Sequence, residues 1–273
     1  MDEPIFSMTL LNGYFFRNTL NIIKNETDKL TFCLRPDGVE ISFKNDVTGH
    51  KIQIHASALQ KYLYNVRDDN GKLSSYYYVT VYTQDIVDRT KSIGKKDKVI
   101  LSITSERKTL DVHPVKSENG IQSNSYGVVS IIEYEPISCT FPDEVYANAK
   151  RAKIIAKELA DLCSRLTSQK SKHLGVLLHN DTHCILQCLN AQGDQVVVNQ
   201  ISLKDNVEDE NAVETNIQYK IPTERAKALS KIHNTSPNPS LVEFFFLENH
   251  PLKLVSKIGD FGTHTFYFKD KST

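Results

Sequence analysis

Residues 12–25, with the sequence NGYFFRNTLNIIKN, have a counterpart about 140 residues further along the chain, and this repeat decides the fold class. The stretch predicts a helix because its apolar residues recur near the helical period: Phe15, Phe16, Leu20 and Ile23. Three more helices are predicted from near positions 83, 153 and 223, so corresponding helices of the two halves start 141 and 140 residues apart. Each half then follows one order: strand, helix, hairpin, second helix, hairpin.

Short apolar runs separated by turn residues lie between these helices, which is the pattern of antiparallel hairpins. An Asp-Gly turn at residues 37–38 joins two such runs in the first half, and Asn-Asp-Thr at residues 180–182 does so in the second. Many short strands with few helices indicate the α+β class. The predicted strands are 30–34, 39–43, 51–55, 76–82, 99–104, 109–115, 126–134, 174–179, 183–189, 195–201, 241–247, 252–258 and 265–268.

A proline-containing stretch separates the two halves. Residues 135–144 contain Pro136 and Pro142 and are predicted to be a connector without regular structure. We therefore expect an N-terminal domain over residues 1–134, a connector over 135–144 and a C-terminal domain over 145–273.

Charge is distributed unevenly, although the chain holds 33 basic and 33 acidic residues. The four segments around the predicted helices hold 16 basic and five acidic residues, a net +11, so the rest of the chain holds −11. This partition favours a polyanion bound on one side, although helices that simply carry solvated lysines would give the same count. The segments are residues 12–25, 84–96, 150–172 and 223–234.

Composition excludes several classes of protein. With 40% apolar residues among 273, the chain can form a core. No apolar run approaches the ~20 residues that span a bilayer, so we expect no membrane partner. The N-terminus does not read as a signal peptide, and an odd number of cysteines indicates a reducing compartment, cytosol or nucleus. The cysteines are Cys33, Cys139, Cys163, Cys184 and Cys188.

Two motifs resemble functional sites, namely a kinase metal-binding segment and a metal site, but each is better explained as part of the fold. The sequence Gly-Asp-Phe-Gly at 259–262 resembles the metal-binding segment of protein kinases, but no His-Arg-Asp precedes it, so a tight turn is expected. His179, His183, Cys184 and Cys188 could ligate a metal. In a strand, however, the two cysteines would lie about 13 Å apart at ~3.3 Å per residue, too far for one zinc ion. We therefore predict no enzyme, no cofactor and no metal.

Four motifs, in this order and spacing, carry a family resemblance. They are residues 6–24 with Gly38-Val39; Ile93-Gly94 with 99–103; Phe141-Pro-Asp-Glu144 with Leu162-Cys163; and Pro251-Leu-Lys-Leu-Val-Ser-Lys-Ile-Gly-Asp-Phe-Gly262 with Phe266-Tyr267. Together they span nearly the whole chain, which resembles a DNA sliding clamp of the proliferating cell nuclear antigen type. Members of that family are commonly acidic, so a neutral chain fits a divergent clamp, for example from a large DNA virus.

The resemblance implies two similar clamp domains, each with two helices packed on antiparallel sheets, and three subunits closed into a ring. Such a homotrimer would encircle double-stranded DNA without reading its sequence, serve as a processivity factor for a DNA polymerase and other replication and repair proteins, and depend on a clamp loader. Its place would be the nucleus, or a viral replication site in nucleus or cytoplasm. The residues expected to face DNA are Arg17, Lys24 and Lys91 by match, and Lys157, Lys227 and Lys231 by helix face.

The resemblance also implies a groove for partner peptides and a contact between subunits. The expected groove walls are Ile137, Phe141, Pro142, Pro251 and Tyr267. The chain departs from the family at Lys44 and at Lys269-Asp270, where apolar or small residues are usual. The expected contact joins strand 126–134 of one subunit to strand 195–201 of the next, through Tyr126, Val128, Ser130, Gln195, Val197 and Asn199.

Four alternatives remain open on the sequence alone. A checkpoint-type clamp subunit would assemble with unlike chains, and a monomeric viral processivity factor would bind DNA with one basic face. A scaffold that does not bind DNA could be built from the same sheets. A small hydrolase would need a clustered nucleophile and base, which is not evident in the sequence.

Overall fold

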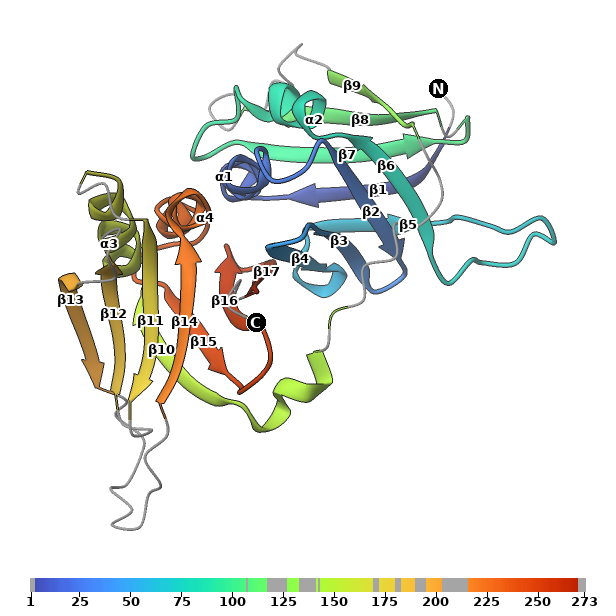
Figure 1. Ribbon diagram of the computed structural model, residues 1–273. Coiled ribbons are helices and arrows are strands. Elements are labelled where there is room, and N and C mark those ends of the chain that lie inside the picture. Colours follow the sequence, from blue (N-terminus) through green and yellow to red (C-terminus); the bar gives the residue numbers. More distant parts are fainter. Residues whose placement is uncertain are drawn as a thin grey trace.

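Three antiparallel sheets and four short α-helices make up the part of the chain that the structure describes (Figure 1). The computed structural model describes residues 3–106, 108–116, 127–132, 141, 143–168, 172–179, 183–189, 195–202 and 216–269. In these ranges the predicted α+β class is confirmed.

The first sheet belongs entirely to the N-terminal half and has the order β5-β1-β7-β8-β9. The strand predicted over 126–134 is shorter in the structure, since β9 ends at Ser130 and Tyr126 lies outside the described residues. The five strands are β1 (Pro4–Leu10), β5 (Lys61–Tyr64), β7 (Lys98–Thr104), β8 (Thr109–Val115) and β9 (Gly127–Ser130).

The second sheet has eight strands and crosses from one half of the chain to the other, in the order β10-β15-β16-β17-β4-β3-β2-β6. The third sheet has the order β13-β12-β11-β14. The eight strands are β10 (Lys150–Ile155), β15 (Leu241–Phe246), β16 (Leu252–Ile258), β17 (Gly262–Phe268), β4 (Thr48–His55), β3 (Gly38–Lys44), β2 (Lys29–Arg35) and β6 (Tyr77–Tyr82). The four strands of the third sheet are β13 (Gln195–Ser202), β12 (His183–Leu189), β11 (His173–His179) and β14 (Asn216–Pro222).

The two halves correspond strand for strand, with β5 as the one addition in the first half. In the first half β1-β7-β8-β9 and β6-β2-β3-β4 form consecutive sheet neighbours, and in the second half β10-β15-β16-β17 and β14-β11-β12-β13 do so. By this correspondence β17 is the counterpart of β9, and β4 is the counterpart of β13. The repeat predicted from sequence spacing is therefore a repeat of topology.

Four helices lie in one row, α2–α1–α4–α3, in which each packs against the next (Figure 1). Their buried faces follow the helical period: Phe16, Leu20 and Ile23 of α1 and Leu159, Leu162 and Leu166 of α3 are fully buried. Ile86, Thr90 and Ile93 are buried too. The helices are α1 (Gly13–Ile23), α2 (Thr83–Thr90), α3 (Ala156–Ser168) and α4 (Thr223–Leu229), with single 3₁₀ turns η1 (Ala56–Ala58), η2 (Asp143–Asn148) and η3 (Ile232–Asn234).

The predicted start of the third helix is wrong. Residues 152–155 belong to β10, where Ala152 and Ile154 are buried while Lys153 and Ile155 are exposed, Ile155 to 40%. This alternation has the period of a strand, and pairing with β15 satisfies its backbone. Lys153 accordingly pairs with Glu243 of β15, Nζ to Oε1 3.3 Å, instead of sharing a helix face with Lys157.

The ends of α2 do not follow the usual capping preferences, in which Thr caps the start of a helix and Gly ends it. Thr83 is the first residue of α2 and its buried hydroxyl makes no capping hydrogen bond, because the chain enters the helix from β6 through Tyr82. Gly94 does not end α2, which stops at Thr90; instead the Gly94 amide donates to Asp97 Oδ2 at 2.7 Å in the following turn. The tight turn predicted at 259–262 is confirmed: Gly259 has φ of +53° between β16 and β17.

Strand β4 of the first half pairs with β17 of the second and joins the halves. On the helix-facing side of this seam, His50 and His264 lie in contact, Nδ1 to Nε2 3.1 Å, between the rings of Phe43 and Phe266. Both histidines are almost fully buried. Burial, with Arg225 adding to it, lowers the pKa of His50 to about 3, and burial together with His50 lowers the pKa of His264. Both imidazoles are therefore neutral at neutral pH.

Candidate nucleic-acid interface and partner pocket

The outer stripe of α1, continued by the residue after it, carries two of the six cations expected to face DNA. Tyr14, Arg17, Asn21 and Lys24 follow each other at helical spacing and are half-buried, whereas most of the helix between them is buried. Arg17 is held in place: its guanidinium lies 4.6 Å from the Tyr14 ring centre and donates to the Ile93 carbonyl at 2.6 Å. It therefore satisfies carbonyl groups just beyond the end of α2, a role that sequence analysis missed.

The other four predicted cations are exposed on the row or at its ends. Lys157 lies in the first turn of α3 and Lys227 in α4, and Lys231 follows α4. Lys91, 73% exposed, follows α2 and pairs with Asp88, Nζ to Oδ1 3.6 Å. Exposed pairs of this kind are weak, so Lys91 remains available to another anion.

The helices themselves carry little net charge, so the surplus counted over the four segments does not lie within the helices. In α3, Lys157 and Arg165 are balanced by Glu158 and Asp161, and in α2 two aspartates outnumber one arginine. The surplus cations lie in the flanking segments, several of them just past helix ends, where the helix dipole favours positive charge. Those past helix ends are Lys24, Lys91, Lys95, Lys96 and Lys231.

A pocket of about 90 Å³ lies on the opposite, outer face of the seam between the halves. Three of the five predicted groove residues meet there, namely Phe141, Pro251 and Tyr267, while Ile137 and Pro142 fall outside the described residues. Both departures from the family pattern that the structure describes also line it. The full lining is Lys44, Thr48, Gly49, Phe141, Pro251, Tyr267 and Lys269.

The register between β4 and β17 builds the pocket. Gly49 lies opposite Tyr267, and Phe141 stacks on the Tyr267 ring with centroids 4.6 Å apart and planes 15° from parallel. A Cβ on Gly49 would lie 2.5 Å from the Phe141 ring, so only glycine leaves room for this stack. Tyr146 of η2 supports the pocket from beneath by donating to the Pro251 carbonyl at 2.5 Å.

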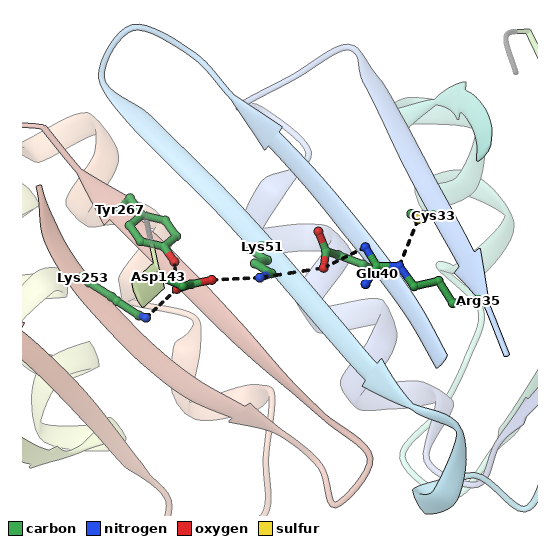
Figure 2. Close-up of polar contacts among 7 residues, drawn as sticks. All are labelled: Cys33, Arg35, Glu40, Lys51, Asp143, Lys253 and Tyr267. Carbon is green, nitrogen blue, oxygen red and sulfur yellow. Dashed lines mark hydrogen bonds and ion pairs between the residues drawn. The ribbon is translucent and has the colours of Figure 1, made fainter. Parts of the chain in front are cut away.

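Asp143 fixes the end of the connector to both halves (Figure 2). Its carboxylate accepts from Lys51 Nζ of β4 at 2.8 Å, from Lys253 Nζ of β16 at 2.6 Å and from the Tyr267 hydroxyl of β17. Glu40 of β3 continues the chain of charges, 3.8 Å from Lys51 Nζ and 3.7 Å from Arg35. We call these five charged residues, Arg35, Glu40, Lys51, Asp143 and Lys253, the outer charge cluster.

The outer charge cluster keeps Asp143 ionised. Burial opposes the charge, but the hydrogen bonds from Lys253, Lys51 and Tyr267 outweigh it and lower the pKa of Asp143 to about 2. The pKa of Tyr267 is raised, first by burial and then by its hydrogen bond to Asp143, so the hydroxyl stays a donor. Sequence analysis gave Asp143 no role, because Lys51 and Lys253 meet it only through strand pairing between distant segments.

The strands predicted to join subunits both lie at sheet edges. On β9, Val128 and Ser130 are exposed while Gly127 and Val129 are buried, and Val128 is 37% exposed. Gln195, Val197 and Asn199 belong to β13, which pairs with β12 on one side and ends its sheet on the other. Tyr126 lies outside the described residues.

The alternative chemistry considered from sequence finds no support in the described ranges. Cys33, Cys163 and Cys184 are buried, and burial raises the pKa of Cys184 to about 12. Within those ranges no three His, Cys, Asp or Glu residues are grouped so as to hold a metal ion. The helices described there are all too short or too polar to cross a membrane.

Comparisons of sequence with known proteins find no relative. No model of a protein family matches the chain, and no curated protein does.

Solved structures, in contrast, match along nearly the whole chain. One is the PCNA2-PCNA3 complex from Sulfolobus tokodaii, with a TM-score of 0.75 and 18% identity over 98% of this chain and 100% of that chain. Another is Proliferating Cellular Nuclear Antigen from Entamoeba histolytica, with a TM-score of 0.76 and 11% identity over 98% and 100%. The resemblance found in the four sequence motifs is thereby confirmed at the level of fold, and the chain has the clamp fold of proliferating cell nuclear antigen.

Proposed function

We propose that this chain is a sliding-clamp subunit, which closes with two further copies into a ring around double-stranded DNA and holds a DNA polymerase and other partner proteins there. It has no catalytic activity of its own in this proposal. The observation that carries it is the pairing of β17 with β4 inside the chain.

That pairing supplies a template for the contact between subunits. Since β9 corresponds to β17 and β13 to β4, the edge β9 of one copy can pair with the edge β13 of the next in the same antiparallel manner. Such a contact joins unlike edges of identical chains, so it repeats until the ring closes, and closure covers edges that would otherwise invite aggregation.

The distribution of charge supports DNA as the ring's content. Cations at the helix ends would neutralise phosphates without contacting bases, which is what movement along DNA requires. Because the helices themselves are nearly neutral, we expect the attraction to come from relatively few lysines, and its salt dependence to be correspondingly shallow.

Assembly is tested first, by light scattering after size exclusion. We expect three times the 31.0 kDa chain mass. The double variant Val128→Glu, Ser130→Glu on β9 should dissociate the trimer through charge repulsion and lost packing. Leu63→Glu is the matched control, because Leu63 is 43% exposed on β5, the opposite edge of the same sheet. A wild-type chain that is monomeric in solution would contradict the proposed homotrimer.

DNA retention is tested second, by comparing closed circular DNA with the same DNA linearised. A ring persists on the circle and slides off free ends, whereas a monomer that binds by one basic face treats both alike. Reversing Lys24, Lys91 and Lys227 to Glu should weaken retention and reduce the slope of log affinity against log salt by about one per lysine. Reversing the exposed Lys61, Lys72 and Lys257, none of them in a helix, is the control. An unchanged slope in the first variant would refute the DNA-facing assignment.

A heteromeric ring is the second candidate, and one structural neighbour favours it, since the Sulfolobus structure is a complex of two different PCNA chains. A lone chain that stays monomeric, yet closes a ring when mixed with unlike clamp chains of its source, would support this candidate.

A further inference from the structure

We infer that the outer pocket selects partner segments in which an apolar anchor is flanked by acidic residues. This inference rests on the proposed use of the pocket for partner proteins. It specifies in addition which charge the pocket prefers in a partner, and the fold alone does not determine that charge.

Two lysines at the rim of the pocket carry the inference. Lys44 ends β3 and Lys269 follows β17, both are exposed, and both line the pocket. Among the described residues neither ammonium group has an ion-pair or hydrogen-bond partner. The backbone brings them together, because Lys44 lies opposite Gly49 and the Lys269 amide donates to the Val47 carbonyl at 3.0 Å. Two cations therefore flank one apolar opening.

The charges behind the pocket do not cancel this positive rim. The outer charge cluster alternates in sign and begins and ends with a cation, so the cluster as a whole carries one net positive charge (Figure 2). On the helix-facing side, Glu26 accepts from the Thr48 hydroxyl at 3.1 Å but is already paired with Arg225. Among the described residues, the exposed carboxylate nearest in sequence to either lysine is Asp46, in the turn that joins β3 and β4. Asp270, which follows Lys269 in the sequence, lies outside the described residues.

Apart from Thr48, the remaining lining is mostly apolar, and the pocket is small in volume. Phe141, Pro251 and Tyr267 form the walls, and about 90 Å³ is less than the ~150 Å³ of a cavity that accepts benzene. An anchor thus fills the opening with one side chain and leaves its neighbours at the rim, within reach of flexible lysines. A carboxylate there gains an ion pair, whereas a second cation meets repulsion.

Three fluorescent peptides test the inference on the wild-type chain. They share one core with a single leucine as the apolar anchor, and they differ only in flanks of Glu, Ser or Lys. We expect the Glu-flanked peptide to bind about three- to tenfold more tightly than the Ser-flanked one, and the Lys-flanked one to bind most weakly, as two exposed ion pairs allow. Raising salt from low to high ionic strength should bring the three affinities together.

Charge reversal supplies the controls. Lys44→Glu with Lys269→Glu should invert the order of the Glu- and Lys-flanked peptides while affinity for the Ser-flanked peptide changes little. The control Lys61→Glu, on distant β5, should leave all three affinities unchanged. Equal affinities, tighter binding of the Lys-flanked peptide to the wild type, or no binding of any peptide would each overturn the inference.

These outcomes are separable from the test of the clamp. A chain that forms a ring on DNA but binds no acidic peptide contradicts only the inference. A chain that forms no ring but binds the Glu-flanked peptide through its two lysines contradicts only the clamp.

Discussion

Both faces of the seam between β4 and β17 join the two halves of the chain, the inner face through apolar packing and the outer face through ion pairs. Facing the helices, His50 and His264 lie neutral among phenylalanine rings. Facing outward, Lys51 and Tyr267 from the same two strands meet the ionised Asp143. The inner face contributes stability through the burial of its side chains. The outer face instead positions the end of the connector beside the pocket. Residues adjacent along a strand can therefore differ completely in what they do.

The largest effect is expected on the inner face. Phe266→Ala should lower the free energy of unfolding by about 3–5 kcal/mol, because Phe266 is fully buried and packs against His50, His264 and Phe268. Denaturant unfolding followed by circular dichroism measures it. A loss below ~1 kcal/mol would mean that the seam contributes little to stability.

Lowering the pH should reduce the stability contributed by the two faces at different pH values, and the inner face should be affected first. The histidine pKa values are lowered in the folded chain, so the unfolded chain binds more protons and stability falls as pH drops below about 6.5 toward 3. His50→Gln should flatten this loss, by up to about 1.4 kcal/mol for each pH unit. His55→Gln, an exposed histidine on the same strand, is the control. Identical pH profiles for wild type and His50→Gln would contradict the assignment.

On the outer face the expected loss is smaller and appears at lower pH. The pKa of Asp143 is lowered to about 2, so its contribution is complete above an unfolded value near ~3.9 and disappears as pH falls through about 2. Asp143→Asn should cost about 1–2 kcal/mol at neutral pH, a modest value because the carboxylate is 35% exposed. It should also weaken peptide binding in the pocket, since Phe141 loses its anchored neighbour. A variant that binds peptide normally would show that the outer charge cluster does not position the pocket.

The smallest change in stability is expected from Gly49→Ala, at most about 1 kcal/mol. The added methyl would meet the Phe141 ring, which can move because it lies on the surface of the sheet. The stack on Tyr267 should be lost, and peptide affinity with it, while unfolding stays nearly unchanged. A Gly49→Ala chain that unfolds much earlier would place Phe141 among the residues that hold the halves together.

Periodicity predicted most of the secondary structure, and it failed where two patterns overlap. The segment 152–155 continues the apolar spacing of α3 backwards, so it was predicted as helix, and only pairing with β15 makes it a strand. The strand β5 was missed because it has just four residues. The strand β14 was missed, although its polar and apolar side chains alternate as in a strand, because it adjoins a long polar stretch. The surplus of basic residues was counted correctly. The ends of the helices, which decide whether a given lysine lies within a helix or beyond it, were not predicted correctly.

The candidate site was only partly predictable. Family resemblance identified Phe141, Pro251 and Tyr267 as pocket walls and marked Lys44 as unusual. The partners of Asp143 could not be found in this way, because Lys51 and Lys253 lie about 200 residues apart in sequence and meet only when β4, β17 and β16 are in register. Pairing over such distances leaves no local trace in a sequence.

The sheet that crosses the seam without interruption also sets the mechanics of the subunit. Seven consecutive residue pairs join β4 to β17, so folding one half against the other would break a whole ladder of backbone hydrogen bonds at once. We therefore expect each subunit to move as a stiff plate. In the proposed ring, a gate for DNA would therefore open between neighbouring subunits and not by flexing within one chain.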